Sequence, residues 1–305
     1  MNAADRPQAT RAGILIPFAI VTLIWGSTWL VITGQLGVVP PSWSVSYRFA
    51  VGGAAMLGYA AWRGERARLD ASGWAFAAAL GMLQFVCNFN FVYRAEQYIT
   101  SGLVAVVFAL LLVPNALLGR LFLGQRLGTQ LLVGSAIAVC GVALLFLHEV
   151  RADPGNTAAL LAGLALTGAG VLSASCANVM QGTALARRFP MIPTIGVAML
   201  LGALFDALYA WATVGPPVFD PRPSYWLGVV YLGVAASAIA FPLYFGIIRV
   251  VGPAKAAYSS VLVPVIAMLL STLFEGYRWS PLAAAGALLV IGGLVTALTA
   301  RRPNR

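Results

Sequence analysis

The chain has 305 residues, of which 60% are hydrophobic and only 9% are charged. An average soluble domain has about a quarter of its residues charged, so this composition excludes an ordinary soluble fold and favours a chain that lies in a bilayer. The formal net charge of +10 would suit a nucleic-acid partner, but its distribution along the chain argues against one, as shown below.

Ten apolar stretches recur along the chain, most of them close to the ~20 residues that a helix needs to cross the hydrocarbon core of a membrane. The connections between them are short and rich in turn formers, such as Gly215-Pro216-Pro217. The first stretch has the basic residues of a signal peptide ahead of it, but nine comparable spans follow, which favours an uncleaved helix. We therefore expect an all-α polytopic membrane protein with spans at 14–33, 43–62, 73–93, 98–122, 129–148, 158–181, 194–214, 224–248, 253–274 and 280–300.

Basic residues are concentrated on one side of these spans. If the N-terminus is cytoplasmic, the outer segments contain four basic residues, Arg94, Arg151, Arg222 and Arg278, and the inner segments contain fourteen. This is a strong positive-inside bias, so both termini are expected in the cytoplasm. The fourteen inner residues are Arg6, Arg11, Arg63, Arg66, Arg68, Arg120, Arg126, Arg187, Arg188, Arg249, Lys255, Arg301, Arg302 and Arg305.

The two halves of the chain repeat one another. Residues 102–125 align with residues 252–275 at an offset of 150 without a gap, so that Pro114 falls on Pro264 and Gln125 on Glu275. We interpret residues 1–150 as a first five-helix repeat and residues 151–305 as a second. Because five is an odd number of crossings, the second repeat enters the membrane from the opposite side, and a substrate site is expected near the midplane between the two.

Polar side chains within the first three spans are candidates for that site, because a polar group in lipid usually faces the bundle interior or a cavity. Trp25 and Thr28 lie in the first span. In the third span, Gln84, Asn88 and Phe91 follow Ala77 and Gly81 at helical spacing and share one face. The alternative is that the amides form interhelical hydrogen bonds that only hold the bundle together.

The later spans contribute a similar set of candidates. The eighth span carries Ser237, Phe241 and Tyr244 on one face, beside a proline that can bend the helix. For each residue, a structural role is the alternative to contact with substrate. The remaining candidates are Ser175 and Asn178 in the sixth span and Tyr258 and Ser259 in the ninth.

Two further features lie at equivalent positions in both halves. Pro114 and Pro264 predict a bend at the same depth in the fourth and ninth spans, which suits gating, although a static kink is the plain alternative. Small-residue faces in the fifth and tenth spans permit close helix contact, either between the halves or in a homodimer. These faces contain Gly134, Ala138, Gly141, Gly286, Val290 and Gly293.

Only two charges lie deep in the spans, Arg48 in the second and Asp206 in the seventh. Each would be costly alone in hydrocarbon, so a mutual ion pair is one interpretation. With no other acid in the central path, transport is expected to run without a proton gradient. Asp206 as a proton carrier is the alternative.

The repeat and its motifs resemble the drug/metabolite transporter superfamily, and within it the EamA family. The resemblance rests on Trp25-Gly26-Ser27, on Arg48-Phe49, and on a proline followed eleven residues later by Gln125 or Glu275; Gln125 departs from the glutamate that is usual there. Within the family, the chain is most similar to the YddG-like exporters of aromatic amino acids. The resemblance implies a bacterial inner-membrane carrier whose cavity is lined chiefly by helices 1, 3, 4, 6, 8 and 9.

The function classes can be narrowed further. No span contains a nucleophile beside a base, a cluster of His, Asp and Glu, or metal-ligand spacing, so we expect no enzyme, no metal and no cofactor. The candidate lining of amides, hydroxyls and rings favours a neutral amino acid or related metabolite as the small-molecule partner. Multidrug or nucleobase-like efflux is the alternative, although the first span lacks the acid that small drug exporters of the superfamily use for cationic drugs. The oligomer is expected to be a monomer or homodimer.

Overall fold

The computed structural model describes residues 11–125, 128–257 and 259–298. This part of the chain is helical, with two π-helical segments, η1 and η4, and two 3₁₀ segments, η2 and η3. The elements are α1 (Arg11–Thr33), α2 (Pro41–Trp62), α3 (Ala71–Leu80), η1 (Gly81–Cys87), α4 (Asn88–Ala95), α5 (Ser101–Phe108), η2 (Ala109–Leu111), α6 (Leu112–Leu123), α7 (Thr129–Ala152), η3 (Pro154–Asn156), α8 (Thr157–Gln181), α9 (Ala184–Arg187), α10 (Met191–Val214), α11 (Pro223–Gly233), η4 (Val234–Ile239), α12 (Ala240–Val251), α13 (Pro253–Ala256), α14 (Ser259–Phe274) and α15 (Pro281–Leu298).

Within the described residues, each predicted span coincides with one helix or with two or three successive helices. Seven of these segments are long and apolar enough to cross a membrane, and two shorter apolar helices follow at 262–274 and 281–297. The remaining predicted span, 43–62, is α2, which is long enough at 22 residues but whose serines and Arg48 lower its hydropathy. The all-α membrane architecture is therefore confirmed.

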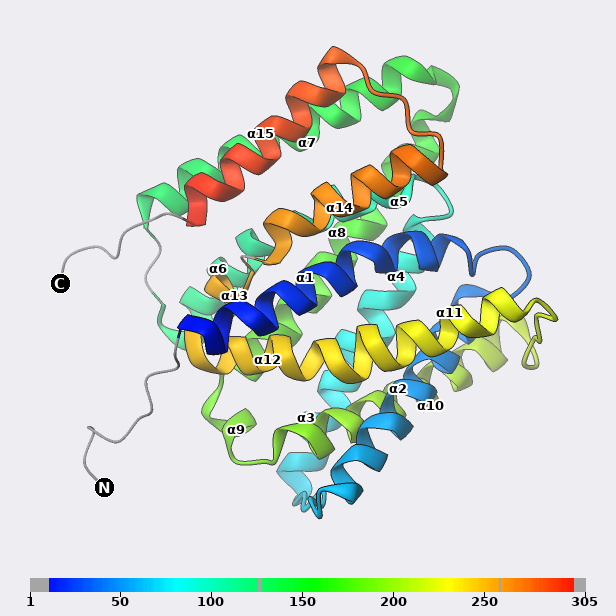
Figure 1. The fold of residues 1–305 in the computed structure, drawn as a ribbon, viewed down its shortest axis with the longest axis vertical. Helices are drawn as coiled ribbons and strands as arrows, with labels where there is room; N and C mark the ends of the chain where they lie inside the picture. The colour runs from blue at the N-terminus through cyan, green and yellow to red at the C-terminus, as the bar shows by residue number, and fades with distance from the viewer. Residues whose placement is uncertain (1–10, 126–127, 258, 299–305) are drawn as a thin grey trace.

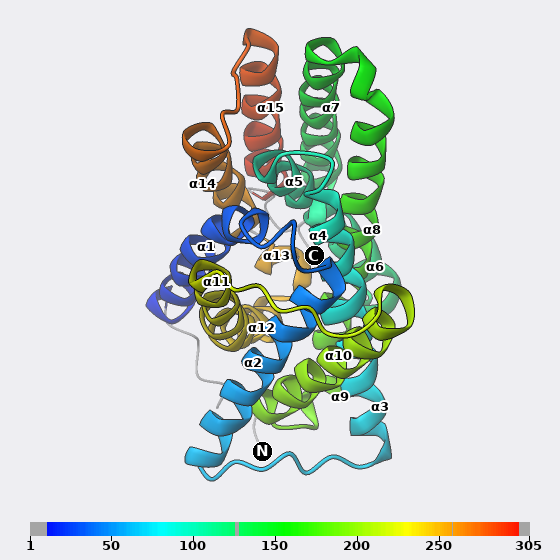
Figure 2. The same cartoon turned by 90° about the vertical axis from the view of Figure 1, so that its right-hand side faces the viewer.

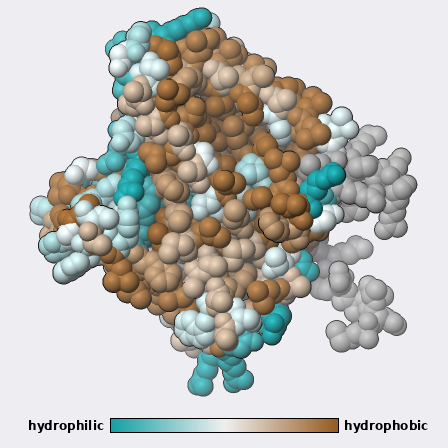
Figure 3. Space-filling view, turned by 180° about the vertical axis from the view of Figure 1, so that it is seen from behind, coloured by the Kyte–Doolittle hydropathy of each residue, from teal (hydrophilic) through white to brown (hydrophobic). Residues whose placement is uncertain are grey.

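The surface has the distribution of polarity that a bilayer requires. Figure 3 shows a broad apolar surface on one face of the molecule, with hydrophilic residues gathered toward its margins. Large apolar side chains are exposed on many of the helices, including Leu121, Leu208, Leu227 and Leu288. Exposed apolar area on this scale is a lipid-facing surface rather than a soluble one.

Helices α7 and α15 form one edge of the molecule, and α2 and α10 lie together at the opposite edge (Figures 1 and 2). A Cβ atom added at Gly141 of α7 would lie 2.6 Å from the Gly286 carbonyl oxygen of α15. One added at Gly134 would lie even closer to the Gly293 carbonyl oxygen. The small-residue faces of the fifth and tenth spans therefore pack the two halves against each other. The first glycine of α7, Gly134, therefore meets the second glycine of α15, Gly293, and the second glycine of α7, Gly141, meets the first of α15, Gly286. A two-fold axis relates contacts in this reciprocal way.

The two π-helical segments also lie at corresponding places. Segment η1 begins ten residues after the start of α3 at Ala71, and η4 begins eleven residues after the start of α11 at Pro223. In a π-turn the backbone hydrogen bond reaches one residue further than in an α-helix, so side chains beyond it are rotated around the axis. Segment η1 contributes Gln84 to the lining of the central cavity described next, and η4 directly precedes α12, which contributes Phe241 and Tyr244.

Candidate functional site

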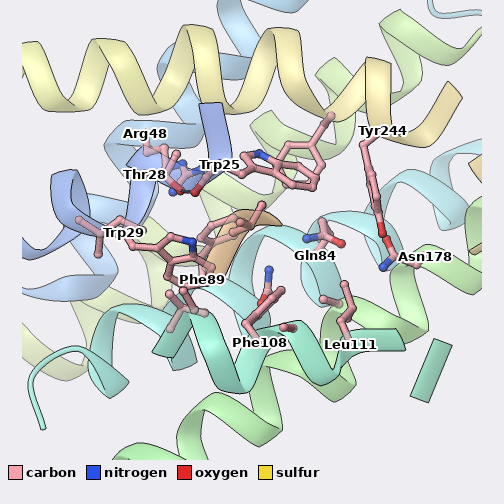
Figure 4. Close-up of a pocket in the computed structure, with 18 residues that line it drawn as sticks. Trp25, Thr28, Trp29, Arg48, Gln84, Phe89, Phe108, Leu111, Asn178 and Tyr244 are labelled. Carbon is pink, nitrogen blue, oxygen red and sulfur yellow. Dashed lines mark hydrogen bonds between the residues drawn. The ribbon is translucent and has the colours of Figure 1, made fainter. Parts of the chain in front are cut away.

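A cavity of about 80 Å³ lies at the centre of the described helices, lined by residues from both halves of the chain. Space of this size holds several water molecules. Figure 4 shows Arg48, Thr28 and Trp29 on one side of the cavity, Tyr244 and Asn178 on the other, and Gln84 between them. The lining comprises Trp25, Thr28, Trp29, Ile32, Arg48, Gln84, Asn88, Phe89, Val92, Ala105, Phe108, Ala109, Leu111, Ala174, Asn178, Phe241, Tyr244 and Val263.

Aromatic rings from four helices form much of the wall. The ring of Trp25 lies 5.4 Å from that of Phe241 and 4.9 Å from that of Tyr244, in both cases edge to face. On the other side, Trp29 and Phe108 have centroids 5.4 Å apart. These separations lie in the favourable range for aromatic pairs, so the rings hold one another in place and present a rigid apolar surface.

The π-helical segments fix two of the helices that bear this lining. The indole nitrogen of Trp25 donates to the carbonyl oxygen of Ala236 in η4 at 3.1 Å. In the other half, the hydroxyl of Ser173 in α8 donates to the carbonyl oxygen of Leu83 in η1 at 2.8 Å. In each half, a carbonyl of a π-helical segment therefore accepts a bond from the first helix of the opposite half.

Seven of the side chains proposed from the sequence do line the cavity: Trp25, Thr28, Gln84, Asn88, Asn178, Phe241 and Tyr244. Ser175 is fully buried but does not belong to the lining. Tyr258 and the side chain of Ser259 lie outside the described residues. The two prolines expected to act in gating stand beside the lining, since Leu111 precedes Pro114 by one turn and Val263 directly precedes Pro264.

Two proposed residues do not line the cavity. Phe91 faces α8, where a Cβ atom added at Gly170 would lie 3.5 Å from the Phe91 Cβ. The expected stripe assumed α-helical spacing, but the π-turns of η1 rotate the residues that follow, so Phe89 and Val92 line the cavity instead. Ser237 is fully buried, donates to the carbonyl oxygen of Leu232, and accepts a bond from the side chain of Arg48.

Arg48 is the largest departure from the expected lining, which contained no charge. Its side chain is 1% exposed and belongs to the cavity wall. Its Nε donates to the Ser237 hydroxyl at 3.1 Å, and its guanidinium lies 4.2 Å from the centroid of Phe89 and 5.2 Å from that of Phe49. A single arginine inside an apolar span was the available signal, and the expected ion pair with Asp206 drew attention away from it.

Asp206 does not pair with Arg48. Its Oδ1 accepts a bond of 2.6 Å from the side-chain amide of Asn90, and Asn90 in turn accepts from the Ser42 hydroxyl at 2.7 Å. Among the described residues, no carboxylate oxygen lies within 4.0 Å of the Arg48 guanidinium. The ion pair proposed from the sequence is therefore wrong, and the two charges have separate surroundings.

Several buried polar atoms of lining residues make no hydrogen bond within the described part of the chain. They are Trp29 Nε1, Arg48 Nη1, Gln84 Oε1, Asn88 Oδ1 and the hydroxyl of Tyr244. A buried polar atom without a partner costs about 1–3 kcal/mol, so a group of them around one cavity indicates a place where a solute or water supplies the partners.

Hydrogen bonds join helices at both ends of the cavity. At the end where α1 stops, the Thr33 hydroxyl lies 2.9 Å from Glu96 Oε2 and 3.1 Å from Glu275 Oε1. Glu275 also accepts from the Ser101 hydroxyl at 2.7 Å, so its carboxylate sits at the N-terminus of α5. We call Thr33, Glu96, Ser101 and Glu275 the glutamate clamp. It connects the ends of α1, α4 and α14 to the start of α5.

The other end of the cavity is joined by neutral groups. The side-chain amide of Asn178 donates to Asn115 Oδ1, and the Asn115 amide donates to the carbonyl oxygen of Pro253, both at 3.3 Å. Gln125, the repeat equivalent of Glu275, places its Nε2 2.8 Å from a Cβ atom added at Gly252, beside the start of α13. Within the described residues, no group of three His, Cys, Asp or Glu side chains could hold a metal ion.

Comparison with known proteins agrees with this architecture. A crystal structure shares the fold with a TM-score of 0.71 at 24% identity, covering 96% of this chain and all of that one. The chain is 29% identical to the uncharacterized inner membrane transporter YedA of Escherichia coli, over 90% of this chain and 87% of YedA. It is 22% identical to a probable amino-acid metabolite efflux pump of Escherichia coli, over 90% and 91% of the two chains.

The sequence profile of the EamA-like transporter family matches the chain twice, at residues 12–147 and 159–299. The two matches indicate duplicated halves, as the internal repeat does, and together they cover most of the chain. This multi-pass membrane protein is therefore a transporter rather than an enzyme, and it belongs to the EamA-like transporter family.

Proposed function

We propose that the protein is a bacterial inner-membrane carrier that exports small metabolites, chiefly aromatic and other neutral amino acids. Residues 1–150 and 151–305 form two inverted five-helix repeats with both termini in the cytoplasm. The solute is exposed alternately to either side from the central cavity between them. The observation that carries this proposal is a cavity that combines a wall of aromatic rings with buried, unbonded polar atoms.

The chemistry of the lining supports this class of solute. Trp25, Phe241 and Tyr244 offer ring surface to an apolar side chain of the solute. Gln84 and Asn178 offer amides to the polar groups of the solute. A relative named a probable amino-acid metabolite efflux pump and the resemblance to aromatic amino acid exporters point the same way. The cavity is small, so a ring-bearing solute enters when lining side chains move apart, and the bends at Pro114 and Pro264 are the proposed places for that motion.

Efflux of drugs is the alternative, and the cavity speaks against lipophilic cations. Within the described residues its only ionisable lining groups are Arg48 and Tyr244. A cationic drug would meet a positive charge there with no carboxylate to balance it, which is unfavourable where the local dielectric is low.

The direct test is a substrate panel with the purified protein in liposomes, comparing labelled amino acids with nucleobases and lipophilic cations. We expect counterflow of aromatic and other neutral amino acids. Trp25→Ala should shift the preference away from aromatic solutes, because stacking surface is lost. Gln84→Ala should lower transport at unchanged expression, and Met82→Ala, a neighbour in η1 that is 40% exposed, is its matched control. Counterflow of lipophilic cations alone would refute the proposal.

A further inference from the structure

We propose that Arg48 binds a carboxylate of the transported solute, and that the indole N–H of Trp29 is a second donor to the same group. This inference rests on the proposed function and makes it specific. It defines the substrates as carboxylates and orients them in the cavity, with the carboxylate on the side of Arg48 and the other polar groups toward Gln84 and Tyr244.

The first argument is the missing counter-ion. Arg48 is 1% exposed, and no described carboxylate lies within 4.0 Å of it. Burying an ion costs several kcal/mol even after the protein relaxes around it. A cation–π contact offsets only part of this cost, so the ring of Phe89 at 4.2 Å does not replace an anion. An anionic group in the cavity would complete this site.

The second argument is the kind of atoms left unbonded. Arg48 Nη1 and Trp29 Nε1 are both buried donors without acceptors, and neither side chain can accept a hydrogen bond. Figure 4 places both residues on the same side of the cavity. A carboxylate has two oxygens that only accept, and the planar guanidinium matches it in geometry. A neutral amide or hydroxyl group could accept from these donors, but it would bring no negative charge to pair with the guanidinium.

The third argument is that Arg48 is held in place. Its Nε is bonded to the hydroxyl of Ser237, which is itself fixed by donating to the Leu232 carbonyl oxygen at 2.7 Å. The ring centroids of Phe49 and Phe89 lie 5.2 Å and 4.2 Å from the guanidinium. This support fixes the side chain while Nη1 stays unbonded, which is the arrangement of a preorganised binding group.

The rest of the cavity, from Gln84 in its middle to Tyr244 on the far side, completes the orientation (Figure 4). Gln84 Oε1 and the Tyr244 hydroxyl are buried and unbonded, and both can accept a hydrogen bond. They suit the ammonium group of a zwitterion, whereas the rings of Trp25 and Phe241 cover its side chain. An α-amino acid with an aromatic side chain therefore satisfies more of these atoms than its amine or amide derivative does.

The test compares four probes that differ only in their charged groups: L-phenylalanine, 3-phenylpropionate, phenethylamine and L-phenylalaninamide. Two readouts are used with the purified wild-type protein, namely inhibition of counterflow of labelled L-phenylalanine and the rise in thermal stability on binding. We expect the two carboxylates to act at concentrations about 10- to 100-fold lower than the amine and the amide, since the latter leave a buried charge unpaired.

Four variants separate recognition from folding. Arg48→Gln should abolish the discrimination between carboxylates and the amide, and Arg48→Lys should retain part of it. Arg63→Gln makes the same change at the exposed end of α2 and should have no effect. Because Arg48→Gln can lower stability, Trp29→Phe serves as a further variant that keeps an aromatic ring and removes the N–H donor. It should weaken binding of the carboxylates without affecting the amine.

The outcomes distinguish this inference from the proposed function. Equal potency of the amide and L-phenylalanine on the wild type, or unchanged discrimination in a folded Arg48→Gln protein, overturns the carboxylate site while leaving amino acid export standing. Stabilisation by 3-phenylpropionate without counterflow of any amino acid supports the site and overturns amino acids as substrates. If none of the four probes stabilises the protein or competes, both proposals are wrong.

Discussion

Asp206 illustrates how a carboxyl group deep in a span is held by a side chain of a neighbouring helix. Its carboxylate accepts a short bond from Asn90, which also accepts from Ser42, and Ser42 accepts from the Arg94 guanidinium at 3.1 Å. This chain of bonds connects α2, α4 and α10 and lies outside the lining of the cavity. Its geometry is that of a buried polar network that holds helices together.

We therefore expect Asp206→Asn to affect folding more than coupling. Loss of the carboxylate weakens a buried bond to Asn90, so the free energy of unfolding should fall by about 1–3 kcal/mol. Counterflow in proteoliposomes held at equal pH should proceed without a proton gradient in both proteins. Accumulation that requires an imposed proton gradient, with the requirement lost in Asp206→Asn, would show that this carboxyl carries the proton.

The candidate site could be anticipated only in part from the sequence, and each misplaced residue has a physical cause of its own. Gln84 and Asn88 were found because a polar side chain in lipid needs a partner. Phe91 was misplaced because π-turns change the register while leaving the composition of the helix unchanged. Arg48 was misassigned because two opposite charges at similar depth suggest a pair, whereas contact also depends on which helices are neighbours.

At the scale of elements, the glutamate clamp brings two carboxyl oxygens to a single hydroxyl hydrogen, that of Thr33. The Thr33 hydroxyl has one hydrogen, yet oxygens of both Glu96 and Glu275 lie within bonding distance. A proton on one carboxyl group would resolve this, because the Thr33 hydroxyl can then accept from that group while it donates to the other. Glu96 follows α4, outside the spanning segment Ala71–Ala95. Burial, reinforced by the neighbouring Glu275 carboxylate, holds the pKa of Glu96 well above its ordinary value.

This predicts a pH dependence of stability with a definite sign. A folded-state pKa above the unfolded value means that the contribution is fully present below the ordinary pKa of glutamate, about 4.3, and is lost as pH rises through the folded pKa. The melting temperature of the wild type should therefore fall relative to that of Glu96→Gln as the pH is raised, because glutamine mimics the protonated acid. Parallel melting curves for the two proteins at every pH would contradict the assignment.

The contact between α7 and α15 predicts a contrast between two adjacent glycines. Gly293 faces the backbone of Ala138 and Gly134, whereas a Cβ atom added at Gly292 meets nothing within 4 Å. Gly293→Ala should destabilise the protein by about 1–3 kcal/mol through overpacking. Gly292→Ala should be neutral or stabilising by up to about 1 kcal/mol, as for other glycines in helices. Thermal denaturation in one detergent compares the two, and equal effects would refute the close packing.

The helices themselves were largely predictable, because the period and length of apolar stretches depend on the thickness of the bilayer. The internal repeat also pointed correctly to duplicated halves. What could not be anticipated was the partition of the third and eighth spans by η1 and η4, since hydropathy does not report the backbone hydrogen-bond pattern. The partner of the α7 glycines was also open from sequence, because a homodimer and an internal contact use the same small residues.

At the scale of the whole molecule, topology is the prediction on which most others depend. Tags at either terminus and at Arg66 should be accessible only from the cytoplasm, and a tag at Asp153 only from outside, because fourteen basic residues are predicted on the inner side against four outside. Accessibility to an impermeant label in intact cells and in inverted vesicles measures this. An external N-terminus would reverse the direction of every step proposed here.

The paired π-helical segments also concern the history of the molecule. Segments η1 and η4 stand at corresponding places in the two halves, and each offers a carbonyl, that of Leu83 or Ala236, to the first helix of the other half. Each half therefore carries both a donor and an acceptor for the contact between the halves, which is the property that lets a duplicated repeat pair with its own copy.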